Sequence, residues 1–268
     1  MPARRRPLLE LDADLGAFVP TDRRRAAWRE LSVEVHRLRP GPWAVGEARG
    51  GAPQLGVLLL SGVIAREVIV SDTVSTELLG PGDVVRPWTI GAQHVLLQRA
   101  VRWNALTESH VAVLDRRFGE ALAGWPEVNA VLIDRIDERA QRLAVTQAIC
   151  QLNRVDRRLL SLFWHLAERW GQMTTEGVAI PLTLSHRMLG QLVGARRPTV
   201  SVALAELAVR GELQRRDDAA WLLTGEPVGL PTEQAQRVVP IRRKLLARAQ
   251  TANRDAHSET AAERRASF

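Results

Sequence analysis

The sequence of 268 residues predicts an α+β fold with three successive parts. Residues 20–118 are rich in short apolar runs separated by turn residues, as antiparallel sheets are. Residues 119–152 hold a long stretch that has neither glycine nor proline after Pro126, which is typical of one long helix. Residues 153–226 combine helical patterns with a short hairpin pattern, and residues 171–181 within them are expected to form a loop.

The first part reads as a series of short strands. Residues 55–70, LGVLLLSGVIAREVIV, have the apolar density of strands, with Gly62 as a turn. In the segment STELLGPGDVVRPW that follows, Gly80-Pro-Gly-Asp83 separates two more short strands. Short strands at this spacing predict a β-roll of the jelly-roll type rather than alternating βαβ units.

The long helix carries apolar residues at roughly helical spacing: Val128, Leu132, Ile136 and Leu143. Pro126 suits its first turn, where the missing N–H costs nothing. A helix this long needs a partner surface along its length. A dimer seam formed by these four residues is the favoured interpretation, and packing against the β-rich part is the alternative.

Residues 182–213, LTLSHRMLGQLVGARRPTVSVALAELAVRGEL, predict a helix over 185–193, a break at Gly194, and a second helix from Arg197. The next stretch, LQRRDDAAWLL, predicts a two-stranded hairpin that turns at Asp217-Asp218. This order is a helix-turn-helix followed by a wing. We expect its DNA-facing residues to be Ser185, Arg196, Arg197, Pro198, Thr199, Ser201, Val202, Arg215 and Arg216.

The net charge is +7, and nearly all of the basic residues are arginine, with Lys244 as the one lysine. Such a charge indicates an anionic partner only where the basic residues cluster. Residues 182–216 carry six arginines against two glutamates. Arginine can form two hydrogen bonds with guanine, and a helix N-terminus can hold a phosphate. A DNA-reading helix is therefore favoured over a helix pair with a solvated charged face.

The stretch LGQLVGARRPTVSVALAELAVRGEL resembles the winged helix-turn-helix of the Crp/Fnr family of bacterial transcription regulators. The order of β-roll, long helix and winged helix agrees with that family over roughly residues 30–225. The resemblance implies a cytoplasmic homodimer that reads a two-fold operator in double-stranded DNA through a recognition helix at 197–210. RNA polymerase is a further candidate partner. Arg197 matches the family's base-reading arginine, whereas Pro198 and Val202 replace two other common readers.

The resemblance also implies an effector pocket in the β-roll. Family members hold a cyclic phosphate with a Gly-Glu pair and an arginine followed by Ser or Thr. Here no Gly-Glu follows Asp83, and the matching Arg99 is followed by Ala100. We expect the altered pocket to use Arg86, Trp88 and Arg99 and not to respond to cyclic AMP. An unknown effector and no effector both stay open, as does a purely surface role for Arg99.

No cofactor is expected. One cysteine, Cys150, is too few for an iron–sulfur cluster and is interpreted as a small buried residue on the long helix, with a reactive thiol as the alternative. No spacing marks His36, His94 or His110 as a haem ligand. The sequence has no P-loop, dinucleotide glycine pattern, zinc-protease motif or nucleophile elbow, so no enzyme is predicted.

The chain has no apolar run long enough for a membrane helix and no signal segment, so a cytoplasmic protein without membrane contact is expected. Residues 227–268 are interpreted as a basic tail, with an amphipathic helix over 232–249 and a polar, disordered end. Two alternatives to a regulator remain: a protein that coats DNA without sequence preference, and a winged helix that docks another protein.

Overall fold

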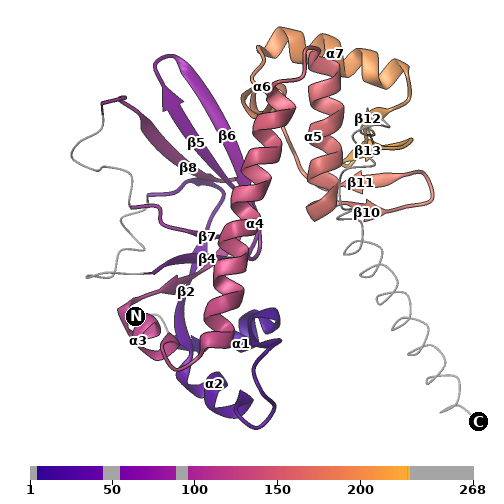
Figure 1. The fold of residues 1–268 in the computed structure, drawn as a ribbon. Helices are drawn as coiled ribbons and strands as arrows, with labels where there is room; N and C mark the ends of the chain where they lie inside the picture. The colour runs from indigo at the N-terminus through magenta and orange to yellow at the C-terminus, as the bar shows by residue number, and fades with distance from the viewer. Residues whose placement is uncertain (1–4, 45–54, 89–95, 228, 230–268) are drawn as a thin grey trace, which may run out of the picture. The chain divides into compact units, whose positions relative to one another are not determined.

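The computed structural model describes residues 5–44, 55–88, 96–227 and 229. The predicted helix over 232–249 and its polar end lie outside these residues, as does His94. The chain divides into two compact units, which are described in turn (Figure 1). The first unit comprises residues 1–155 and 184–201, and the second comprises residues 156–183 and 202–268.

The first unit contains two antiparallel sheets, which confirms the predicted β-roll with its α+β architecture. The five-stranded sheet has the order β1 (Arg5–Pro7), β2 (Ser32–Leu38), β9 (Ser109–Leu114), β4 (Gly56–Ser61), β7 (Val84–Val85). The four-stranded sheet has the order β3 (Gly41–Pro42), β8 (Ala100–Ala105), β5 (Ile64–Val70), β6 (Thr73–Leu79). Residues 64–70 of β5 pair in register with residues 73–79 of β6.

The N-terminal segment belongs to this core, although no helix or strand was predicted for it. β1 pairs with β2, and Leu8, Leu15 and Val19 are buried in the same cluster as Leu58 and Phe118. The segment forms α1 (Leu8–Leu11), a 3-10 turn η1 (Ala13–Gly16) and α2 (Arg24–Glu30). These elements are too short to leave a periodic apolar pattern in the sequence.

Two helices follow the β-roll: α3 (Arg116–Leu122), capped by Asp115, and α4 (Pro126–Cys150) (Figure 1). Val128 is fully buried and Leu132 nearly so, both in the core of their own β-roll. The prediction that they form a dimer seam is therefore wrong. The apolar stripe was read as one face, but its N-terminal half packs within the protomer, and only Ile136 and Leu143 remain exposed.

Arginines on α4 fasten the rest of the helix to the β-roll. Arg135 forms a bidentate pair with Asp12, whose Oδ1 lies 2.8 Å from Nη2. Arg139 donates to both carboxylate oxygens of Glu77 on β6 at 2.7 and 2.8 Å. Arg142 pairs with Asp83, a buried carboxylate that also accepts a hydrogen bond from the amide of residue 80.

Glu77 is the centre of this arrangement because it serves two arginines. It also accepts a hydrogen bond of 3.1 Å from Arg66 on β5. Burial is the largest single influence on Arg139 and opposes its charge, but the hydrogen bond to Glu77 and the negative charges of Glu77 and Asp83 together outweigh it, so the pKa of Arg139 is raised above its ordinary value. The Glu77 side chain is 12% exposed, which shields these pairs from solvent.

β6 is the edge strand of its sheet. The helix α6 (His186–Val193) packs against it. The buried Thr76 hydroxyl on β6 donates to the side-chain oxygen of Gln191 on α6 at 3.2 Å. Adjacent residues of β6 thus hold two different helices, with Thr76 bound to α6 and Glu77 bound to α4.

The second unit contains α5 (Val155–Trp170), the continuation of α7 (Arg197–Val209) and a small antiparallel sheet. Phe163 packs against Trp221 with ring centroids 4.9 Å apart. The sheet has the order β10 (Gln172–Met173), β11 (Val178–Ile180), β13 (Trp221–Leu223), β12 (Leu213–Arg215). The predicted hairpin is confirmed. The predicted loop at 171–181 is wrong, because β11 pairs with β13 and extends that hairpin.

We predict that Glu77→Gln lowers the free energy of unfolding by about 2 kcal/mol, because two partly buried arginines lose their counter-charge. The matched control is Glu67→Gln on the neighbouring strand β5, whose partner Arg102 is 55% exposed. That change should cost less than about 1 kcal/mol. Urea unfolding followed by tryptophan fluorescence measures both. Equal losses would contradict the central role of Glu77.

Candidate nucleic-acid interface

A tight turn joins α6 to α7. Gly194 ends α6 in the left-handed conformation, with φ of +65°. The amide of Ala195 then donates to the carbonyl of Gly190 at 2.9 Å. A Cβ atom on Gly190 would lie 2.4 Å from the Ala195 carbonyl oxygen, so only glycine permits this approach. Gly194 was predicted as the break between the two helices. The need for glycine at residue 190 was not predicted, because a glycine inside a helix does not by itself show which atoms pack against it.

The exposed surface of α7 agrees with the predicted one. Val200, Leu204 and Leu207 are buried, as the helical spacing predicted. Val202 is 61% exposed on the opposite side. The predicted DNA-facing residues at the start of the helix are also exposed: Arg196, Arg197, Pro198 and Thr199. Pro198 stands in the first turn, as predicted.

This surface is electrostatically suited to an anion. The N-terminus of a helix presents unpaired N–H groups and a partial positive charge. Neither α6 nor α7 has an acidic residue in its first turn, where one would offset that charge. Arg187 on α6 and Arg196 and Arg197 at the start of α7 are exposed instead. The helix pair can therefore hold phosphate groups and present guanidinium donors to them.

Both serines predicted to contact DNA are engaged within the protein. The Ser185 hydroxyl caps α6 by accepting a hydrogen bond from the amide of Met188 at 3.2 Å. The Ser201 hydroxyl lies 2.8 Å from Nδ1 of His186 and 3.1 Å from the carbonyl oxygen of Arg197. Ser201 therefore links α7 to α6, and its contact with DNA stays a prediction. His186 was missed because its partner is fifteen residues away in the sequence.

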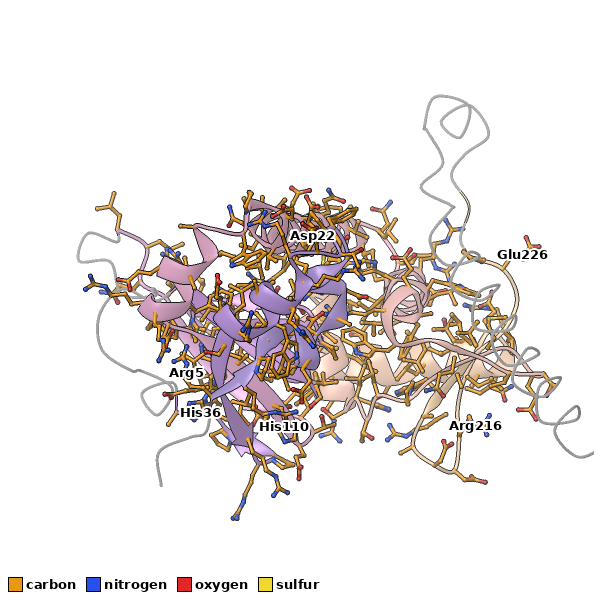
Figure 2. All side chains as sticks on the ribbon, turned by 90° about the horizontal axis from the view of Figure 1, so that it is seen from below. Arg5, Asp22, His36, His110, Arg216 and Glu226 are labelled. Atoms are coloured by element: carbon orange, nitrogen blue, oxygen red, sulfur yellow. The ribbon has the colours of Figure 1, made fainter. Side chains whose placement is uncertain are left out.

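The two hairpin arginines differ in their surroundings. The Arg215 guanidinium lies 5.1 Å from the ring centre of Trp221, and its residue is exposed. Arg216, which is labelled in Figure 2, lies in the hairpin. Its side chain is 3.6 Å from both Glu176 and Asp218. These are exposed ion pairs that contribute little stability, so Arg216 can exchange them for another anion at low cost.

A cavity of about 450 Å³ lies between the β-roll and α4. Three arginines line it: Arg66 on β5, Arg86 directly after β7, and Arg139 on α4. Apolar residues that line it include Val84, Trp103, Leu132, Ile133 and Ile136.

Of the predicted effector residues, only Arg86 lines this cavity, and it donates to the carbonyl of Leu55 at 2.6 Å. Trp88 packs against the apolar core of the β-roll, and Arg99 is exposed just before β8. Trp88 and Arg99 are not among the residues that line this cavity, and their role in an effector site stays a prediction. The sequence offered no signal for Arg66 and Arg139, which the fold brings together from β5 and α4.

The other candidate ligand residues have protein partners. His36 and His110 lie on the paired strands β2 and β9 (Figure 2). His36 approaches Glu34 at 3.9 Å, and His110 is 3.0 Å from the Ser61 hydroxyl. The Cys150 thiol, at the end of α4, donates to the carbonyl of Leu192 at 3.5 Å. Among the described residues, no group of His, Cys, Asp or Glu could hold a metal ion.

Comparison with known proteins identifies the C-terminal part first. Residues 154–224 match the model of the Crp-like helix-turn-helix domain. A CRP-like cAMP-activated global transcriptional regulator of Mycobacterium tuberculosis is 35% identical over 114 residues, which is 40% of this chain and 49% of that protein. The matching part thus spans about half the length of this curated relative.

Solved structures agree in fold over a longer range. A cyclic nucleotide-binding domain containing protein from Listeria monocytogenes has a TM-score of 0.58 at 16% identity, covering 80% of this chain and 97% of its own. A mutant of CooA from Carboxydothermus hydrogenoformans has a TM-score of 0.55 at 18% identity, covering 72% and 84%. Residues 154–224 therefore form a Crp-like helix-turn-helix domain, and the longer chain shares the fold of these solved structures.

The curated relative that this chain matches over part of its length is a transcriptional regulator. Within the described part of the chain, no helix combines the length and apolar character needed to cross a bilayer.

We predict that Gly190→Ala destabilises the helix pair by about 3 kcal/mol, because the new methyl group collides with the Ala195 carbonyl. The control is Gly194→Ala, where no atom lies within 4 Å of the added Cβ and only the positive φ is penalised. We expect about 1 kcal/mol there. Hydrogen exchange of the α6 and α7 amides measures both. A smaller effect at Gly190 than at Gly194 would refute this description of the turn.

Proposed function

We propose that this chain is a sequence-specific, DNA-binding transcription regulator that acts as a homodimer. The observation that carries the proposal is the exposed N-terminal end of α7, which follows a tight glycine turn and presents Arg196 and Arg197 without a nearby acidic residue. Such an end fits the major groove of DNA, where a recognition helix enters with its N-terminus first.

The residues take different parts in this proposal. Arg197 reads a base, because a guanidinium can form two hydrogen bonds with O6 and N7 of guanine. Val202 is exposed and apolar, which suits contact with a thymine methyl group. Thr199 and Arg196 hold phosphates beside it, and Arg215 and Arg216 of the hairpin contact the backbone. Pro198 gives no donor, so the operator differs from those read by a glutamate at that position.

The exposed face of α4 supports the homodimer. Ile133 is 56% exposed, Ile136 49% and Leu143 38%. Together with the exposed Ala140 they are spaced by three, four and three residues, which is the a/d spacing of a coiled coil. Exposed apolar residues at this spacing mark a helix seam. A second copy of α4 would cover the stripe and separate two recognition helices for the two halves of an operator.

The arginine-lined cavity supports control by a small anionic effector. Ile133 and Ile136 belong both to the cavity and to the exposed stripe, so a second protomer would border the site. An effector that binds there must compete with Glu77 for Arg66 and Arg139. The cavity lacks Arg99, the matching phosphate-binding arginine. We therefore propose that cyclic AMP is not the effector, and that the protein needs neither haem nor an iron–sulfur cluster.

The test of DNA binding starts with selection of random duplex DNA by the purified protein, followed by sequencing. We expect a two-fold motif. Arg197→Ala should then weaken binding to that motif by about ten- to a hundredfold, through loss of one bidentate base contact. The control is Arg116→Ala on α3, which removes the same charge from an exposed ion pair. Added cyclic AMP should leave the affinity unchanged.

The alternatives give different outcomes. A protein that coats DNA would bind with a steep salt dependence and enrich no motif. If the winged helix instead docks another protein, the natural protein and the Arg197→Ala variant would bind DNA equally weakly.

We predict that Ile136→Glu raises the dimer dissociation constant by about a hundredfold, because it buries an unpaired carboxylate in the seam. Val145→Glu is the control, since Val145 lies on the same helix and is 44% exposed but falls outside the stripe. Sedimentation equilibrium measures the association of both variants. A dimer that survives Ile136→Glu unchanged would place the seam elsewhere.

A further inference from the structure

A chain of contacts links the first residue of α6 to the N-terminal part of α7. His186 begins α6, directly after the Ser185 cap. Its Nδ1 lies 2.8 Å from the Ser201 hydroxyl oxygen, and that hydroxyl lies 3.1 Å from the carbonyl oxygen of Arg197. The chain therefore ends at Arg197, the residue assigned to base reading.

The proton positions along this chain follow from the number of hydrogens available. The Ser201 hydroxyl has one hydrogen, and the Arg197 carbonyl can only accept. Both contacts are hydrogen bonds only if the hydroxyl donates to that carbonyl and accepts from Nδ1–H of His186. Neutral His186 then carries its proton on Nδ1, and Nε2 is an unprotonated acceptor. Within the part of the chain that the structure describes, Nε2 has no hydrogen-bond partner.

The surroundings of His186 are basic. The nearest charged residues along the two helices are three exposed arginines. These are Arg187 on α6, Arg196 just before α7, and Arg197 at the start of α7. β6 and α4 meet α6 at the other end, through Thr76 with Gln191 and Cys150 with Leu192. Gln191 and Leu192 lie five and six residues along α6 from His186, or about 7 to 9 Å away. Glu77 on β6 is held by its own arginines.

We propose that His186 is a phosphate-contacting and positioning residue that makes DNA binding take up a proton. This inference rests on the proposed DNA-binding function. A phosphate oxygen only accepts hydrogen bonds, so Nε2 can bind one only when it is protonated. Protonation leaves the Nδ1–H bond to Ser201 in place and adds a cationic donor at the DNA-facing end of α6. The link to Arg197 holds the base-reading residue while the phosphate is bound.

The consequence is a pH-dependent affinity. Because the DNA complex favours the protonated ring, affinity falls as the pH rises from pH 6 to pH 8. We expect operator affinity to fall by about tenfold for each protomer bound between pH 6 and pH 8. His186→Gln removes the titration and should flatten this dependence, while the introduced side chain keeps an amide donor for Ser201.

The test measures operator affinity at constant ionic strength from pH 6 to pH 8 for the natural protein and for His186→Gln. The matched control is His165→Gln on α5, whose ring pairs with Glu168 at 3.2 Å and should leave the slope unchanged. Ser201→Ala removes the link to Arg197. Without the Ser201 hydroxyl the neutral ring can also carry its proton on Nε2 and donate to the phosphate, so this variant should flatten the slope as well, a result that a purely structural role for His186 does not produce.

A second readout needs no DNA. The ¹⁵N chemical shifts of the His186 ring at pH 8 should show a protonated Nδ1 and an unprotonated Nε2. The opposite tautomer overturns the proposal, and so does an equal pH slope in His186→Gln and the natural protein. Specific binding that is independent of pH also overturns it but leaves the proposed function intact. Absence of specific binding at every pH overturns the proposed function itself, and the inference with it.

Discussion

One constraint organises the first unit: α4 must satisfy two different surfaces along a single helix. Its N-terminal half contributes Val128 and Leu132 to the core, and its arginines pair with carboxylates from separate parts of the β-roll. Since charged pairs require defined geometry, these contacts fix the rotation of the helix about its axis. That rotation decides which residues are left exposed, and therefore where an apolar stripe and a cavity can occur.

Much of the fold could be predicted because its signals are local. Gly194, Pro198 and the apolar spacing of Val200, Leu204 and Leu207 determine the helix pair within a short stretch of sequence. The hairpin was equally predictable, since Asp217-Asp218 marks the turn between its two strands. In each case the residues that form the element are also the residues that cause it, so no knowledge of a distant partner is needed.

The errors share the opposite property. The stripe on α4 showed that a partner exists, but only the fold shows that Leu132 meets its own β-roll while Ile136 does not. Residues 171–181 were predicted to form a loop, but they contain β11, which forms a strand because it pairs with β13. Arg66 and Arg139 form one site from distant segments, and Ser201 looked free to contact DNA until the fold placed His186 next to it. Such pairings depend on tertiary contacts that a single sequence does not display.

The contact between β6 and α6 has a consequence for folding quality. An uncovered edge strand exposes a row of unpaired amide and carbonyl groups, which can recruit a strand from another chain. Here α6 packs against that edge, held by Thr76 and Gln191. A helix of the pair that we propose to bind DNA therefore also protects the sheet against misassembly. Any change that frees α6 from the β-roll trades regulatory freedom against a risk of aggregation.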